Sequence, residues 1–166
     1  MSAFDDVLAA NAEYTKTFQD PDLPGQAAAG LAVVTCMDSR IDPLGMLGLD
    51  RGDAKILRNA GGRVTEDVLR TLVLAAHLLG VRRVLVAQHT DCRMAKVTDE
   101  EAHAAIREQS GLDTRSLEFR TMPDQREALL GDVQKIRSSP YLPADLAVAG
   151  AVLDVRTGRL DVVVEP

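Results

Sequence analysis

The chain has 166 residues, a length typical of one globular domain, which we expect to span residues 1–166. Its net charge is −6 and it has no long basic run, so nucleic-acid binding is not expected. The sequence contains neither an apolar run of about 18 residues nor the basic start of a signal peptide. We therefore expect a cytoplasmic protein without nucleic-acid or membrane partners.

The first 30 residues predict an N-terminal arm, in which residues 3–19 form a helix. Residues 20–30 hold two Pro and two Gly and indicate a loop. Residues 31–35 are apolar and β-branched, which is typical of a strand buried on both faces of a parallel sheet. A second, shorter strand is expected at residues 54–57.

The apolar spacing of residues 65–79 predicts a well-buried helix. Thr65 is a suitable N-cap for this helix, because its hydroxyl can accept a hydrogen bond from a free backbone N–H. Gly80 follows the last apolar residue and can adopt the left-handed conformation that ends many helices. Residues 83–88 then predict a third strand.

Thr98 and Glu101 form the sequence pattern of a capping box, which predicts the start of another helix. Residues 112–122 have no regular pattern. Pro123 is expected to be the first residue of a further helix, since proline is favoured at that position. This helix is expected to end by Ser139, because Pro140 follows it.

Two final strands are expected at residues 146–153 and 160–164, joined by a short turn that makes them antiparallel. Alternating strands and helices indicate an α/β fold. The prediction is a mostly parallel central sheet of about four strands, with a C-terminal antiparallel strand and flanking helices.

Cys36 and His89 each follow a predicted strand, and Cys92 lies three residues after His89. In parallel sheets ligands bind beyond the carboxyl ends of the strands. Two thiolates and one imidazole suit Zn²⁺, and three protein ligands leave a fourth position for chemistry. Each cysteine taken alone fits a small buried apolar residue, so the hypothesis depends on all three residues together.

Asp38 and Arg40 lie within the segment that follows Cys36. Asp38 is placed to accept a hydrogen bond from a nucleophile on the metal, and Arg40 is placed to pair with Asp38 and keep it ionised. Without Arg40, Asp38 would be drawn onto the metal as a fourth ligand. The alternative interpretation is that the two residues form a solvated ion pair without a role in catalysis. His77 and His103 are expected in core, interface or solvated positions.

The sequence resembles the β-class carbonic anhydrases, and is similar to their compact bacterial members. The resemblance is carried by C-x-D-x-R at residues 36–40, R-N-A-G at residues 58–61 and H-x-x-C at residues 89–92. It covers nearly the whole chain from Leu31 onward. The order and the intervals of the three motifs match the family, and the combination is more specific than any one motif.

The resemblance implies reversible hydration of carbon dioxide to bicarbonate and a proton by a zinc lyase with one zinc per chain. In this family the zinc lowers the pKa of its water toward ~7, which supplies hydroxide at neutral pH. Asp38 and Arg40 would be the catalytic pair that orients it. Gly61 and Gly62 would line the substrate pocket. The resemblance also implies a homodimer or a dimer-based oligomer.

Arg93 departs from the family pattern, which often has Gly directly after the second cysteine. Its side chain would narrow the pocket, alter the acidity of the zinc water or point to solvent. Relatives that act on carbonyl sulfide or carbon disulfide share the zinc ligands, so these substrates remain alternatives. A non-catalytic zinc-binding relative is a further alternative. A thiol redox protein is disfavoured, because the chain has no C-x-x-C motif.

Overall fold

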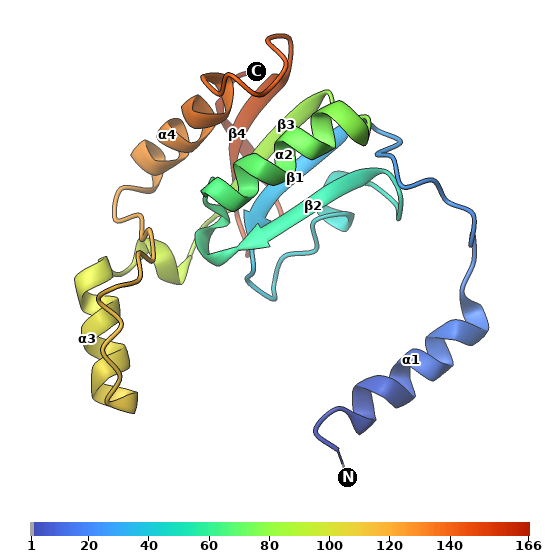
Figure 1. The fold of residues 1–166 in the computed structure, drawn as a ribbon. Coiled ribbons are helices and arrows are strands. Elements are labelled where there is room, and N and C mark those ends of the chain that lie inside the picture. Colours follow the sequence, from blue (N-terminus) through green and yellow to red (C-terminus); the bar gives the residue numbers. More distant parts are fainter. Residues whose placement is uncertain (1) are drawn as a thin grey trace.

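The structure, a computed structural model that describes residues 2–166, is organised around a five-stranded sheet (Figure 1). Only Met1 of the expected domain and N-terminal arm lies outside the described residues. The strands are arranged in the order β2-β1-β3-β4-β5. Their bounds are β1 (Leu31–Cys36), β2 (Ala54–Asn59), β3 (Arg83–His89), β4 (Ala147–Leu153) and β5 (Leu160–Val164).

The predicted sheet is confirmed in its strand directions. β1 pairs in parallel with both β2 and β3, β3 pairs in parallel with β4, and β5 is antiparallel to β4. All of β1 after its first residue is buried, as the continuous apolar pattern predicted. Because β1 and β3 are parallel neighbours, their carboxyl ends meet at the same edge of the sheet.

Within residues 2–166, helix α1 precedes the sheet, and three α-helices and three short 3₁₀ helices lie in the connections between strands. The predicted caps of two of them are confirmed: Thr65 accepts a hydrogen bond from the Val68 N–H, and Thr98 and Glu101 form a reciprocal capping box. The bounds are α1 (Asp5–Thr17), α2 (Glu66–Leu78), α3 (Asp99–Ser110), α4 (Gln125–Arg137), η1 (Gly45–Leu47), η2 (Ala60–Gly62) and η3 (Arg93–Ala95).

The predicted start of the last helix at Pro123 is wrong by two residues. The helix begins at Gln125, and Asp124 is its N-cap, with a carboxylate that accepts a hydrogen bond from the Glu127 N–H. A carboxylate at this position satisfies an N–H that would otherwise have no partner in the first turn. Pro123 therefore precedes the cap.

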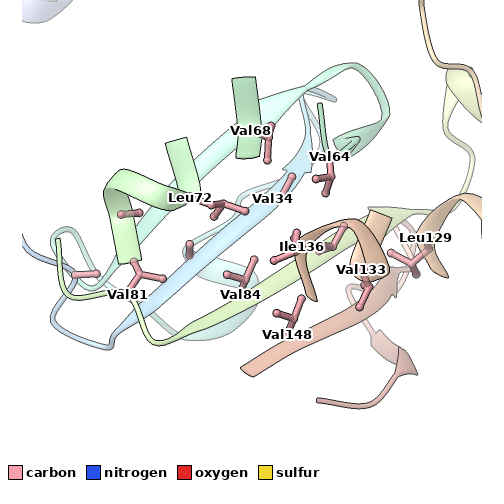
Figure 2. Packing of buried hydrophobic residues seen from close by; sticks show 14 residues of the cluster. Val34, Val64, Val68, Leu72, Val81, Val84, Leu129, Val133, Ile136 and Val148 are labelled. Atoms are coloured by element: carbon pink, nitrogen blue, oxygen red, sulfur yellow. The ribbon is translucent and has the colours of Figure 1, made fainter. Parts of the chain in front are cut away.

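The main core lies between the sheet and the two helices α2 and α4, which cover the same face of the sheet (Figure 2). Leu72 of α2 and Leu129 of α4 are completely buried against alternate residues of the strands, including Val34 and Val86. Each such leucine contributes about 1.5–3 kcal/mol by its removal from water. This packing holds β1 and β3 in the register that brings their ends together.

Two helices lie away from this core. Figure 1 shows α1 projecting from the sheet at one side and α3 projecting at another. Neither helix has a buried residue, although α1 carries several apolar side chains. Within residues 2–166, no helix combines the length and apolar character that crossing a membrane requires.

Candidate functional site

Three candidate ligands meet at the carboxyl edge of the sheet. Cys36 is the last residue of β1, His89 is the last residue of β3, and Cys92 lies on the loop that follows β3. One side-chain donor atom of each lies within 4.8 Å of the others, and the two Sγ atoms are 4.0 Å apart. All three residues are buried. The structure therefore brings together the three residues that the sequence singled out.

The imidazole of His89 is oriented as a metal ligand. Its Nδ1 donates a hydrogen bond to the carbonyl oxygen of Thr90 at 2.8 Å, so the proton is on Nδ1. Nε2 is buried and has no hydrogen-bond partner within residues 2–166. A hydrogen bond from one ring nitrogen to a backbone carbonyl and a free lone pair on the other nitrogen are the features expected of a metal-binding histidine. The side chains present thus fit a metal ion.

Protonation of these groups competes with metal binding. Hydrogen bonding from Cys92 lowers the pKa of Cys36, and the same bond raises the pKa of Cys92. Burial opposes a charge on His89, but the negative charge of the nearby Cys36 thiolate outweighs burial, so the pKa of His89 is raised. Since thiolates and neutral imidazole bind metals, acid is expected to weaken metal binding.

Asp38 and Arg40 form a bidentate ion pair beside the three candidate metal ligands, which together form the ligand group. Arg40 Nε donates to Asp38 Oδ1 at 2.9 Å, and Arg40 Nη2 donates to Asp38 Oδ2 at 2.7 Å. The guanidinium lowers the pKa of Asp38 and holds it ionised. Asp38 Oδ2 lies 3.9 Å from Nε2 of His89, which places a charged carboxylate next to the ligand atoms.

Arg58 supports the segment that follows Cys36. In the sequence it was named only as part of the R-N-A-G motif, and no role was predicted for it. Its guanidinium donates hydrogen bonds to three backbone carbonyls at 2.7 to 3.3 Å, those of Cys36, Asp38 and Ile41. Three bonds from one planar group hold the segment that carries both a thiol and the carboxylate. The R-N-A-G motif was the signal that could have identified this role.

Asp91 is a second residue that the sequence reasoning missed. It lies between His89 and Cys92, and its Oδ2 accepts a hydrogen bond from Arg40 Nη1 at 2.8 Å. Its other oxygen is paired with Lys96. Nothing in the spacing of H-x-x-C indicates this contact, because Arg40 is 51 positions away in the chain.

Gly61 and Gly62 are both buried next to Cys36. The backbone N–H of Gly61 donates to Cys36 Sγ at 3.3 Å, which favours the thiolate. Gly62 has a φ of +65°, and a Cβ there would lie 2.9 Å from the backbone carbonyl carbon of Thr35. Gly62 is thus required for close packing of two backbone segments. Contact of either glycine with a substrate remains a prediction.

The ligand group has an apolar environment. Ile41, Met122 and Leu153 are buried in one cluster with the two cysteines, and Met46 and Met94 pack against it. Arg93 is exposed, and its side chain forms no hydrogen bond or ion pair with any of residues 2–166. This exposure agrees with the expected orientation of Arg93 toward solvent.

Comparisons with known proteins agree on one family. The family model described as carbonic anhydrase matches residues 31–160. β-Carbonic anhydrase 1 of Mycobacterium tuberculosis is 38% identical over 162 residues, which cover 97% of this chain and 98% of that protein. A carbon disulfide hydrolase of Acidianus is 32% identical over 153 residues, which cover 78% of this chain and 75% of that protein.

Solved structures show the same relationship. The crystal structure of a carbonic anhydrase from Streptococcus mutans superposes with a TM-score of 0.91 at 39% identity, covering 98% of both chains. A carbonic anhydrase from Glaciozyma antarctica superposes with a TM-score of 0.86 at 36% identity, covering 98% of this chain and 99% of that one.

Proposed function

The chain belongs to the β-class carbonic anhydrase family, and from this premise we propose that it hydrates carbon dioxide reversibly to bicarbonate and a proton, using one zinc ion. Cys36, His89 and Cys92 would hold the zinc. The observation that carries the proposal is the convergence of two thiols and the free Nε2 of His89 within 4.8 Å. This donor set is one that zinc prefers.

A zinc ion held by these residues would make a water molecule a competent nucleophile at neutral pH. Asp38 is ionised and lies beside Nε2 of His89, so it can accept a hydrogen bond from that water and orient it toward carbon dioxide. Arg40 holds the carboxylate in place through two hydrogen bonds. The apolar cluster around the cysteines favours an uncharged substrate.

We predict that Asp38→Asn lowers kcat for carbon dioxide hydration by about 10- to 100-fold, the usual effect of changes next to metal ligands. The reason is that an amide cannot replace the ionised acceptor and also pairs weakly with Arg40. Stopped-flow hydration at mildly alkaline pH, with zinc content measured on the same samples, tests this. Asp161→Asn makes the same change in an exposed ion pair with Arg159 and is expected to leave kcat unchanged. An inactive wild-type protein with one zinc per chain would contradict the proposed function.

Carbon disulfide is a second candidate substrate, because a carbon disulfide hydrolase is 32% identical to this chain. Carbonyl sulfide and carbon disulfide are small and apolar like carbon dioxide, so the cluster around the cysteines suits all three. Release of hydrogen sulfide from carbon disulfide or carbonyl sulfide by the zinc-loaded protein, without carbon dioxide hydration, would favour this alternative. Hydration without sulfide release favours carbon dioxide.

We further propose that the protein is a homodimer in which α1 packs on the second copy. Val7 and Leu8 of α1 are 59% and 64% exposed, and α1 touches no core of its own chain. With the exposed residues Phe4, Tyr14 and Phe18 they form an apolar stripe at helical spacing. A helix with this apolar stripe is stable when the stripe is covered. An apolar hollow on the sheet, lined by Leu31, Leu47, Leu49 and Leu85 among others, offers a complementary surface.

Negative charges at Val7 and Leu8 are expected to dissociate the two subunits of the dimer. We predict a dimer for the wild type and a monomer for the double variant Val7→Asp, Leu8→Asp in sedimentation velocity, because buried unpaired carboxylates are costly. Ala9→Asp adds one charge on the opposite side of the helix and is expected to remain dimeric. A dimeric double variant would contradict the role of α1, and a monomeric wild type would contradict the dimer.

A further inference from the structure

The guanidinium of Arg40 lies between two carboxylates that come from different strand ends. Nε and Nη2 face Asp38, which follows β1, whereas Nη1 donates to Asp91 Oδ2 at 2.8 Å on the loop after β3. Nη2 also donates to the backbone carbonyl of Asp91 at 3.3 Å. Arg40 therefore links the two loops that supply the candidate metal ligands.

The two carboxylates use different N–H groups of Arg40, so they do not compete for it. Asp38 keeps its two side-chain bonds and a third from the Arg40 backbone N–H at 3.0 Å, while Asp91 is bound at the same time. Lys96 pairs with the other oxygen of Asp91, so two cations and two anions alternate and their charges balance. Such a network is better ordered than an isolated surface pair.

Arg40 needs this second anchor because it is exposed. Its side chain is 43% exposed, and a single exposed ion pair is worth only about 0–1 kcal/mol. Asp38 Oδ2 is already only 3.9 Å from Nε2 of His89. If Arg40 swung toward solvent, the carboxylate would be left beside a metal ion with no competing cation.

We propose that Asp91 is a positioning residue, which holds Arg40 in place and thereby keeps Asp38 paired with Arg40 instead of binding the metal. This inference rests on the proposed function, since it assumes a metal at Cys36, His89 and Cys92. Asp91 acts through Arg40 and touches neither substrate nor metal. The backbone of Asp91 agrees with this assignment, because its φ of +59° is left-handed and the side chain projects from a turn.

The left-handed backbone determines which variants test the proposal. Asp91→Gly removes the side chain and is compatible with a positive φ, whereas Asp91→Ala would add backbone strain. Asp91→Asn also tolerates this conformation and retains an acceptor for Arg40, so it is the conservative variant. Lys96→Gln removes the charge beside Asp91 and leaves the contact between Arg40 and Asp91.

The readout that does not depend on activity is the visible spectrum of the protein loaded with Co²⁺ in place of zinc. In the wild type, added azide is expected to change this spectrum, because a metal with three protein ligands has an exchangeable position. In Asp91→Gly the response to azide is expected to be lost, because Asp38 binds the metal. It is expected to return in the double variant Asp38→Ala, Asp91→Gly. Asp91→Asn and Lys96→Gln are expected to respond like the wild type.

In the hydration assay, Asp91→Gly is expected to lower kcat about 10-fold with little change in KM. Three results would overturn the proposal: an azide response in Asp91→Gly equal to that of the wild type, a loss that persists in the double variant, or loss of the metal from Asp91→Gly. The last result would mean that Asp91 supports Cys92 and not Arg40. If the wild type binds cobalt but hydrates no carbon dioxide, the proposed function fails, and the spectra still decide the role of Asp91.

Discussion

His89→Gln is expected to lose the metal and at least about 100-fold of the hydration activity. Changes next to metal ligands already cost about 10- to 100-fold in affinity, so loss of a ligand has a larger effect. The imidazole is completely buried, and its Nε2 has no other partner within residues 2–166. A glutamine amide is a much weaker ligand than imidazole, and it leaves only the two thiolates. Metal content by mass spectrometry and stopped-flow hydration measure the two losses.

His77 provides the matched control, because it is exposed and its Nε2 bonds to the carbonyl oxygen of Tyr141. His77→Gln makes the same chemical change away from the cysteines and is expected to retain both metal and activity. Circular dichroism should show the same secondary structure for both variants. A His89→Gln protein that retains one metal per chain and full activity would show that the metal is bound elsewhere.

Asp132→Asn is expected to lower the free energy of unfolding by about 3–5 kcal/mol, the usual cost of removing one partner from a buried ion pair. Arg63 Nε donates to Asp132 Oδ2 at 2.6 Å, and the two side chains are only 15% and 2% exposed. Arg63 also donates to the carbonyl oxygen of Arg120 at 2.7 Å. The substitution would leave the largely buried guanidinium of Arg63 without its carboxylate while preserving the shape of the Asp132 side chain.

Urea unfolding followed by circular dichroism measures this loss as a shift of the midpoint. Asp67→Asn is the control, since Asp67 and Arg70 form an ion pair with side chains 74% and 66% exposed. An exposed helical pair of this kind contributes about 0.3–0.5 kcal/mol. Equal midpoint shifts for the two variants would contradict the importance of the buried pair.

The sequence was sufficient to predict the elements whose signals are local. The continuous apolar run at β1, the helical apolar spacing of α2 and the capping box at Thr98 each involve residues a few positions apart. The start of α4 was misplaced because proline is favoured at the first helical position. The actual cap is Asp124, which directly precedes the first helical residue, Gln125.

The candidate ligands were also predictable, for a reason that combines sequence and topology. Cys36 and His89 each end an apolar strand, and parallel neighbouring strands bring their carboxyl ends to one edge. Hence residue type and strand position together were enough to indicate one site. The pairing of Asp38 with Arg40 was equally accessible, since the two residues are only two positions apart.

Contacts between distant segments could be seen only in the folded chain. The Asp91 bond to Arg40 spans 51 positions, and the Asp132 bond to Arg63 spans 69. Which charged residues pair across such separations depends on loop paths and on how α4 packs, and residue spacing carries no information about either. The sequence by itself determined the strands, the caps and the metal-binding residue types. The tertiary structure alone decided which side chains hold the metal-binding residues in position, because contacts such as that of Asp91 with Arg40 exist only after the core has assembled.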